Sequence, residues 1–307
     1  GYRATPGPQV TLGAVSVSGL GRLREAYVQR RLGLRLGEPY SPARLEAARR
    51  DLLAGGVLAW ARLTAGTVPD AEGRLPLTLE LAERPPRVLR VAASFSSDEG
   101  TTGSASWTHR NLFGGAEQLT LRGEVGSPIA NRAQTNYLGD LNLRVPDLWR
   151  RDLDLRLNLG AVSEDLEAYD REAVTAGAAL ERRVSARLGL SGGLAYERSR
   201  IAQDGPPQDY ELLSLPLTLT ADTTDDLLNP RRGLRLAVQA APTQVLTGDA
   251  SGFLVSRLAV SGYLDVTGAL RGWPGADEPD RTGPIDARRG SGRTVLAGRV
   301  LLGSIVG

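Results

Sequence analysis

One pentapeptide of the chain, Gly189-Leu190-Ser191-Gly192-Gly193, matches the Gly-x-Ser-x-Gly pattern of hydrolase nucleophile elbows. In those enzymes the serine lies on a sharp turn between a strand and a helix. Here the pentapeptide continues an alternating apolar pattern and no helical pattern follows it, so we interpret Ser191 as a strand residue. The chain has a single histidine, His109, and no cysteine, which argues against a catalytic triad and a zinc site.

Three aspartates, Asp222, Asp225 and Asp226, are the other group that could do chemistry. Carboxylate oxygens bind calcium, but this spacing fits no calcium-binding loop. The alternative is a solvated turn whose aspartates accept hydrogen bonds from the local backbone. We therefore predict no metal site, no cofactor and no enzymatic activity.

Composition narrows the remaining classes of protein. Hydrophobic residues make up 41% of the 307 and charged residues 23%, which predicts a folded chain. The net charge of +2 is too small to indicate a nucleic-acid partner. No apolar run approaches the roughly 18 residues that a membrane-spanning helix needs. If the protein resides in a membrane, strands must therefore cross it.

The elements that would position these residues are strands with a period of two. In residues 152–159, leucine occupies every odd position and Asp154, Arg156 and Asn158 occupy even ones. Side chains on a strand alternate between faces, so this segment has one apolar and one polar face. The pattern recurs in residues 119–122, 213–220 and 234–239. Many such strands are typical of a membrane barrel, and we place Leu155 near the middle of a lipid-facing strand.

About eleven strand candidates follow the break at Arg84-Pro85-Pro86-Arg87, where neither proline suits a central strand. They are Val88–Phe95, Gly103–His109, Glu117–Gly126, Thr135–Val145, Asp152–Val162, Glu172–Glu181, Ala186–Glu197, Leu212–Ala221, Gly233–Val245, Phe253–Val266 and Thr294–Ile305. We expect an antiparallel transmembrane barrel over residues 85–307. It would be incomplete, because single-chain barrels have even strand numbers and no free edge.

Residues 1–84 predict a separate small α+β domain with the order β-α-α-β-β. A strand at residues 10–17 precedes a helix at residues 24–32. Ser41 as N-cap and Pro42 open a second helix, which Gly55-Gly56 ends. Strands at residues 58–65 and 75–83 follow.

Several short motifs, taken together with their order and spacing along the chain, resemble the BamA/TamA superfamily of outer-membrane assembly proteins, and most closely its TamA branch. Residues 15–19, 37–41 and 56–58 are similar to a POTRA domain, whose order is β-α-α-β-β. Asn229, Pro230 and Gly233, after Asp222, resemble a mid-barrel turn of the family. The residues that resemble the first barrel hairpin are Asp98, Glu99, Gly100, Trp107, His109, Arg110, Asn111, Leu112, Phe113 and Gly114.

The resemblance implies a POTRA domain (1–84) in the periplasm and a barrel (85–307) in the bacterial outer membrane. It implies a TamA-like factor that promotes insertion or secretion of envelope proteins such as autotransporters. The implied partners are outer-membrane lipid, unfolded outer-membrane protein clients and an inner-membrane-anchored, TamB-like periplasmic protein. A two-partner-secretion type of polypeptide pore and a BamA-like insertase are the alternatives.

Two strand edges are the interaction sites that this reading predicts. The family's second POTRA strand lies at the edge of its sheet and could receive an extended client by strand addition; here it comprises Leu58, Ala59, Trp60, Ala61, Arg62, Leu63, Thr64 and Ala65. Packing of Trp60 and Leu63 into the core of the domain is the alternative for those side chains. The seam strand of the barrel comprises Val88, Leu89, Arg90, Val91, Ala92, Ala93, Ser94 and Phe95, and its unpaired edge could template an incoming strand.

The chain also departs from the family pattern. Family barrels have sixteen strands and an Arg-Gly-Phe/Tyr loop motif, and we expect both to need residues after Gly307. Strand alternation from a periplasmic POTRA domain predicts that 127–132, 164–171 and 201–210 are extracellular. The same alternation predicts that 111–116, 146–151 and 222–232 are periplasmic.

Overall fold

The computed structural model describes residues 10–97, 100–127, 135–165, 169–203, 205–248, 251–267 and 294–307. The chain divides into two compact units, which we describe separately. The first contains Gly1–Ala176 and Ser199–Gln208, and the second contains Gly177–Arg198 and Asp209–Gly307. The predicted domain boundary after residue 84 stays a prediction.

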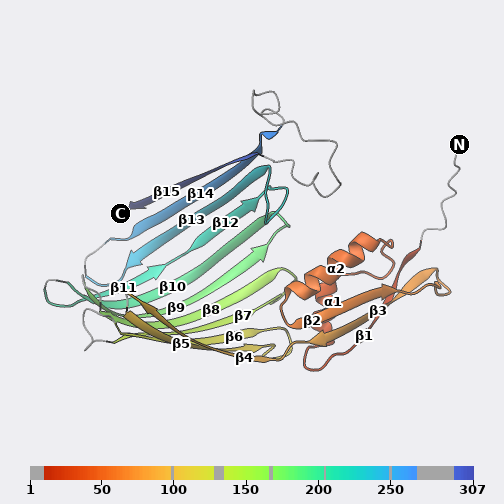
Figure 1. Ribbon diagram of the computed structural model, residues 1–307, viewed down its shortest axis with the longest axis horizontal. Helices are drawn as coiled ribbons and strands as arrows, with labels where there is room; N and C mark the ends of the chain where they lie inside the picture. Colours follow the sequence, from red (N-terminus) through yellow and green to blue (C-terminus); the bar gives the residue numbers. More distant parts are fainter. Residues whose placement is uncertain are drawn as a thin grey trace, which may run out of the picture. The chain divides into compact units, whose positions relative to one another are not determined.

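The first unit begins with a small α/β part of the chain, β1 to β3, which we call the α/β subunit. Its element order is the predicted β-α-α-β-β (Figure 1). Its elements are β1 (Thr11–Ser18), α1 (Glu25–Leu32), α2 (Pro42–Ala54), β2 (Leu58–Ala65) and β3 (Arg74–Glu83). The strands form a sheet in the order β1-β3-β2, with β1 parallel and β2 antiparallel to β3. Strand β2 therefore lies at an edge of this sheet, with β3 in the centre.

Local sequence explains where helix α2 begins and ends. Ser41 occupies the N-cap position with an extended backbone, although its side chain makes no capping hydrogen bond, and Pro42 follows at the first helical position. Gly55 caps the other end, and Gly56 follows with a φ of 75°, a left-handed conformation that favours glycine. The face of the helix with Leu45, Ala48 and Leu52 is buried. Together with residues of α1 and the sheet, these side chains form the core of the subunit.

A second sheet of twelve described strands follows. In the first unit, β4 (Arg87–Ser96), β5 (Gly100–Arg110), β6 (Gln118–Ser127), β7 (Asn136–Val145) and β8 (Leu153–Asp165) pair antiparallel in sequence order. Strands β9 (Asp170–Arg183) and β10 (Leu188–Ala202) contribute residues to both units. The later strands are β11 (Gln208–Ser214), β12 (Leu217–Asp222), β13 (Gly233–Val245), β14 (Phe253–Asp265) and β15 (Val295–Val306). Among the strands that the structure describes, the order ends at β4 and β15, so these strands do not form a closed barrel.

One predicted strand, Leu212–Ala221, is two strands in the structure, β11 and β12. The break falls at Leu215 and Pro216, because proline lacks the N–H that a continuous ladder needs. The break is hydrogen-bonded: Leu215 N–H donates to the Pro242 carbonyl (2.9 Å), and Gly193 N–H donates to the Pro216 carbonyl (3.0 Å). Strand β13 pairs with both pieces.

Apolar side chains align across neighbouring strands of this sheet. Leu121, Leu141 and Leu159 are partners across β6, β7 and β8. Leu121 is 40% exposed and Leu159 is 54% exposed, so this face does not pack as an ordinary protein core. Leu155 is only the third residue of β8, and Leu159 lies at its middle, which corrects the predicted central position of Leu155. Neither described helix is long and apolar enough to span a bilayer.

Candidate functional site

The predicted interaction strand β2 presents a partly exposed surface. A bulge between Leu58 and Trp60 resets the register, after which Ala61 and Leu63 pair with Leu81 and Leu79. Ala61 is buried and Leu63 packs against the core, whereas Trp60 is 49% exposed. The alternative of a core position therefore holds for Leu63 and is wrong for Trp60.

The hydrogen-bond pattern shows which backbone groups of β2 face outward. Gly66 N–H donates to the opposite Pro76 carbonyl (2.8 Å), which makes this a hydrogen-bonded pair. Such pairs alternate along an antiparallel ladder. Thr64 therefore bonds toward β3, while the N–H groups of Ala61, Leu63 and Ala65 point away from it. At the other end of β2, the Leu58 carbonyl accepts a hydrogen bond from Arg84 Nε (2.8 Å).

Strand β4, the predicted seam strand, also has backbone groups that face away from its partner β5. Arg110 N–H donates to the Pro86 carbonyl (2.6 Å), and the register continues from Arg87 opposite His109. Val88, Arg90, Ala92 and Ser94 therefore bond toward β5. The outward N–H groups belong to Leu89, Val91, Ala93 and Phe95. Side chains of this second set are strongly exposed: Leu89 by 69%, Val91 by 75% and Phe95 by 72%.

The hairpin motif forms the β5–β6 turn, although Asp98 and Glu99 lie outside the described residues. Gly100 and Trp107 belong to β5, and the rings of Trp107 and His109 are 5.8 Å apart. Asn111 has a φ of 61°, and its Oδ1 accepts a hydrogen bond from Ala116 N–H (3.1 Å).

Glu117 completes this turn and was not singled out from the sequence. Its carboxylate accepts hydrogen bonds from Phe113 N–H (2.9 Å) and Gly115 N–H (3.0 Å). Its carbonyl accepts a further bond from Leu112 N–H (3.0 Å). The available signal was an acidic residue shortly after the Gly114-Gly115 pair, where a carboxylate can satisfy turn N–H groups.

This turn packs into the α/β subunit. The Gly114 carbonyl accepts a hydrogen bond from Arg24 N–H (2.8 Å), just before helix α1. Ala116 is 5% exposed and belongs to the same buried cluster as Leu23 and Tyr27. Gly114 has a φ of 94°, and a Cβ there would lie 2.8 Å from Arg24 Cγ, so only glycine suits the contact. The motif residues thus join the sheet to the α/β subunit.

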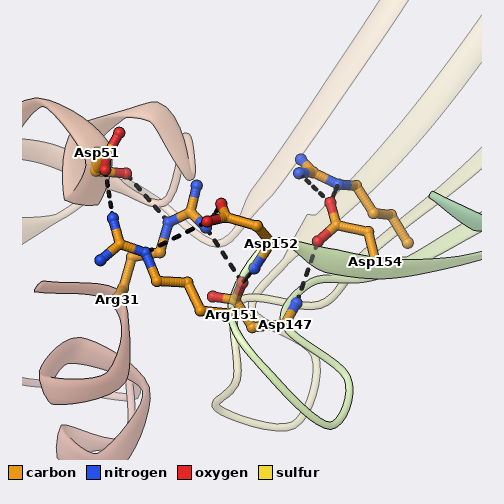
Figure 2. A network of polar contacts seen from close by, with 7 residues as sticks. Arg31, Asp51, Asp147, Arg151, Asp152 and Asp154 are labelled. Atoms are coloured by element: carbon orange, nitrogen blue, oxygen red, sulfur yellow. Dashed lines mark hydrogen bonds and ion pairs between the residues drawn. The ribbon is translucent and has the colours of Figure 1, made fainter. Parts of the chain in front are cut away.

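A buried ion-pair network makes a second junction between them (Figure 2). Arg31 Nη1 lies 3.1 Å from Asp147 Oδ1 and 3.1 Å from Asp152 Oδ1, both in the β7–β8 turn. Arg31 Nε donates to the Asp51 carbonyl (3.2 Å), and Arg151 forms an ion pair with the Asp51 carboxylate. Asp147 is 1% exposed and Arg31 8%, so two opposite charges are held together out of water.

Electrostatics in this junction follow from burial. Burial alone would lower the pKa of Arg31, but Asp147, Tyr27 and Asp152 favour its charge and leave the pKa above its ordinary value. Burial raises the pKa of the neighbouring Tyr27 hydroxyl to about 12. Arg31 therefore stays charged and Tyr27 neutral at physiological pH. No short-range motif signalled this network, because its members are distant in the chain.

The three aspartates of the possible metal site accept hydrogen bonds from backbone N–H groups of the β12–β13 turn. Asp225 Oδ1 accepts hydrogen bonds from Arg231 N–H (2.8 Å) and Arg232 N–H (3.2 Å), which lower the pKa of that carboxyl. Asp226 Oδ1 accepts from Asn229 N–H (2.8 Å) and Leu228 N–H (2.8 Å), with the same effect on its pKa. The described part of the chain contains no cluster of three or more metal-binding side chains. The hydrogen bonds that Asp225 and Asp226 accept from the backbone favour the local-turn interpretation.

The motif glycine of this turn, Gly233, has a φ of 112°, and a Cβ there would lie 2.6 Å from the Thr223 carbonyl oxygen. Asn229 and Pro230 lie in the same turn. The Gly189–Gly193 pentapeptide lies inside strand β10, so the strand interpretation of Ser191 is confirmed.

Comparisons with known proteins show which family the chain resembles. The Omp85 superfamily domain matches residues 111–277. The outer membrane protein assembly factor BamA of Neisseria meningitidis is 24% identical over 141 residues, which cover 46% of this chain and 17% of that protein.

Two solved structures share the fold. BamA from Haemophilus ducreyi lacking POTRA domains 1–3 has a TM-score of 0.63 and 15% identity, with 84% of this chain and 52% of that chain covered. CdiB from Acinetobacter baumannii has a TM-score of 0.59 and 14% identity, with 83% and 49% covered. The chain spans about half of these structures and a smaller part of the Neisseria relative. Since the family domain matches more than half of its residues, the chain belongs to the Omp85 superfamily.

Proposed function

We propose that this protein is a TamA-like outer-membrane factor that helps to insert or secrete envelope proteins such as autotransporters. The single observation that carries the proposal is the combination, in a member of the Omp85 superfamily, of an exposed apolar face with strand edges that no other described strand pairs with. The apolar face, with Leu121, Leu141 and Leu159 aligned, suits contact with lipid. The edges of β2 and β4 suit contact with extended polypeptide.

The proposed mechanism is physical and involves no covalent chemistry. An extended client would add beside β2, accepting hydrogen bonds from the outward N–H groups of Ala61, Leu63 and Ala65. Main-chain bonding requires no fixed client sequence, and this suits a factor with many clients. A client strand could then pair with the outward groups of β4 during insertion, with its apolar side chains beside Leu89, Val91 and Phe95.

We further propose that residues 1–84 form a periplasmic POTRA domain and residues 85–307 part of the barrel. The element order of the α/β subunit and its contacts with the β5–β6 and β7–β8 turns support a shared periplasmic side for these three features. Its expected partners are outer-membrane lipid, unfolded outer-membrane proteins and a TamB-like protein anchored in the inner membrane.

Crosslinking in cells tests the client contact. A photoreactive amino acid at Arg62, on the exposed face of β2, should crosslink to an autotransporter arrested during secretion. The same amino acid at Glu46, on the surface of helix α2, is the matched control and should give less product. Equal yields at both positions would contradict a client site at β2. A stable, large conductance in planar bilayers would instead favour the polypeptide-pore alternative.

A further inference from the structure

The second unit contains a cavity of about 470 Å³ on the polar face of its strands. Four arginines and one aspartate contribute the charges of its lining, so their net formal charge is +3; these residues are Arg183, Arg187, Arg235, Arg299 and Asp222. The volume falls within the usual range of ligand sites, roughly 300–1,000 Å³. A hollow whose lining has a net positive charge concentrates anions.

Strand register explains how distant arginines meet here. Asp222 pairs with Arg235, Arg235 with Ser261, and Ser261 with Arg299, so a polar row crosses β12, β13, β14 and β15. The Asp222 N–H donates to the Arg187 carbonyl (2.8 Å), which extends the row to the start of β10. Neighbouring strands lie about 4.8 Å apart, so the backbones of Arg235 and Arg299, on either side of Ser261, are roughly 10 Å apart. Arg187 and Arg299, at the two ends of the row, are roughly 19 Å apart at the backbone, so their long side chains would have to extend toward each other to share one ligand.

The hollow itself comes from small residues in the adjacent row. Gly189, Thr220, Ala237 and Ala259 are successive cross-strand partners and all line the cavity. Because these side chains are short, they leave space beside the long arginine side chains, and this space is the cavity. A Cβ on Gly189 would lie 2.8 Å from Thr220 Oγ1, so the cavity lining is closely fitted at that point.

The arginines that line the cavity differ in whether their guanidinium groups already have polar partners. Arg235 Nε bonds to Asp222 Oδ2 (2.9 Å), and its Nη2 donates to the Leu227 carbonyl (2.7 Å). Its guanidinium also lies 5.5 Å from the ring centroid of Tyr263. In the described part of the chain, no acidic side chain forms an ion pair with Arg187 or Arg299. The +3 lining thus has two guanidinium groups available to a ligand.

We propose that this cavity binds a phosphoryl anion, either a small soluble phosphate or the phosphate of a lipid headgroup. A phosphoryl group carries up to two charges and three acceptor oxygens, which suits several convergent donors better than one carboxylate does. The donors are the Arg299 guanidinium and the Ser261 hydroxyl on neighbouring strands and, from the other end of the row, the Arg187 guanidinium. Thr220 contributes no donor, because its hydroxyl already bonds to the Gly189 carbonyl (3.5 Å). Guanidinium forks bind phosphate oxygens in pairs.

Inorganic pyrophosphate is the first probe, titrated calorimetrically into the full chain in a non-ionic detergent. Arg299→Gln and Arg187→Gln should each weaken its binding about tenfold, because each removes a charge-assisted hydrogen-bond donor. Arg257→Gln is the matched control: it lies on the same face of β14 as Ser261 but does not line the cavity. It should change affinity less than twofold. Absence of binding, or equal losses in Arg299→Gln and Arg257→Gln, would overturn the proposal.

The source of the phosphate is decided by a second arm. Nanodiscs of phosphatidylcholine alone and with phosphatidylglycerol are compared by the number of phosphatidylglycerol molecules that co-purify with wild type, Arg299→Gln and Arg257→Gln. Selective loss in Arg299→Gln identifies a lipid headgroup, whereas pyrophosphate binding without lipid retention identifies a soluble anion. A tetraglutamate peptide that competes with pyrophosphate at equal affinity would show a carboxylate site and refute the phosphoryl assignment.

Discussion

Arg31 Nη1 lies 3.1 Å from Asp147 Oδ1, although the two residues are 116 positions apart in the chain. Arg31 belongs to helix α1, and Asp147 belongs to the turn between β7 and β8. The contact therefore joins the α/β subunit to the large sheet. A buried ion pair of this kind is strongly destabilised when one partner is removed, because the other charge stays buried without compensation.

Arg31→Met should lower the free energy of unfolding of the first unit by about 3–5 kcal/mol. Methionine keeps the length of the side chain but leaves the Asp147 carboxylate without its guanidinium. Thermal unfolding followed by circular dichroism measures the loss. Arg62→Met is the control, because Arg62 is exposed and lies 3.9 Å from Glu80; its effect should stay below about 1 kcal/mol. Arg31→Met/Asp147→Asn should recover part of the stability, and a double variant no better than Arg31→Met would contradict the role of charge.

Leu159→Arg should lower the fraction of protein that folds in lipid vesicles more than Asn158→Arg does. The two residues are adjacent in the middle of β8 and both are exposed, but they point to opposite faces. If the leucine face contacts lipid, an arginine there costs about 2–4 kcal/mol at mid-bilayer depth. Heat-modified gel mobility after refolding into lipid vesicles measures folded protein. Equal losses in both variants would remove the lipid-facing assignment of Leu159.

Ala61→Pro should weaken crosslinking of clients to β2 while the α/β subunit stays folded. The Ala61 N–H points away from β3, so proline removes a donor from the free edge only. Thr64→Pro is the contrasting change, because the Thr64 N–H bonds toward β3 and its loss should lower stability. The yield from the photoreactive residue at Arg62, together with circular dichroism of each variant, separates the two effects. A folded Ala61→Pro variant with full crosslinking would exclude strand addition at this edge.

Tyr27 should make the first unit lose stability at alkaline pH. Its pKa is raised to about 12 by burial, from an ordinary value near 10. The folded state therefore holds its proton more tightly than the unfolded state does. This contribution is complete below about pH 10 and is lost as pH rises to about 12, with a total of about 3 kcal/mol. Unfolding midpoints at pH 9 and pH 11.5 for wild type and Tyr27→Phe measure it. The variant should show the smaller decline, and equal declines would contradict the assignment.

Single cysteines test which strand ends face the periplasm. Asp165 ends β8, and Asp225 lies in the β12–β13 turn. Strand alternation predicts that Asp165→Cys reacts with a membrane-impermeant maleimide in intact cells. Asp225→Cys should react only after the outer membrane is opened. The reverse labelling pattern would invert the proposed topology.

Sequence periodicity by itself determined most of the secondary structure. Alternating leucines in residues 152–159 identified β8 because a strand exposes its two faces at a period of two, independent of distant contacts. Ser41-Pro42 and Gly55-Gly56 located the ends of α2 because helix termini depend on local backbone preference. Residues 58–65 coincide with β2. The division at Pro216 was missed because the alternation of apolar residues continues through it. The proline has no N–H to donate, and this interrupts the strand only where a neighbouring strand would need that hydrogen bond.

Tertiary structure alone decided which residues meet. No local pattern indicates that Arg31 would be paired with Asp147, since an ion pair between distant segments depends on how the chain folds back. The direction of the Ala61 N–H depends on the register of β2 against β3, and the bulge at Leu58 resets that register. The row from Asp222 to Arg299 likewise exists because four strands align at one level. Composition reveals that arginines are abundant, but only hydrogen-bonded register brings four of them around one cavity.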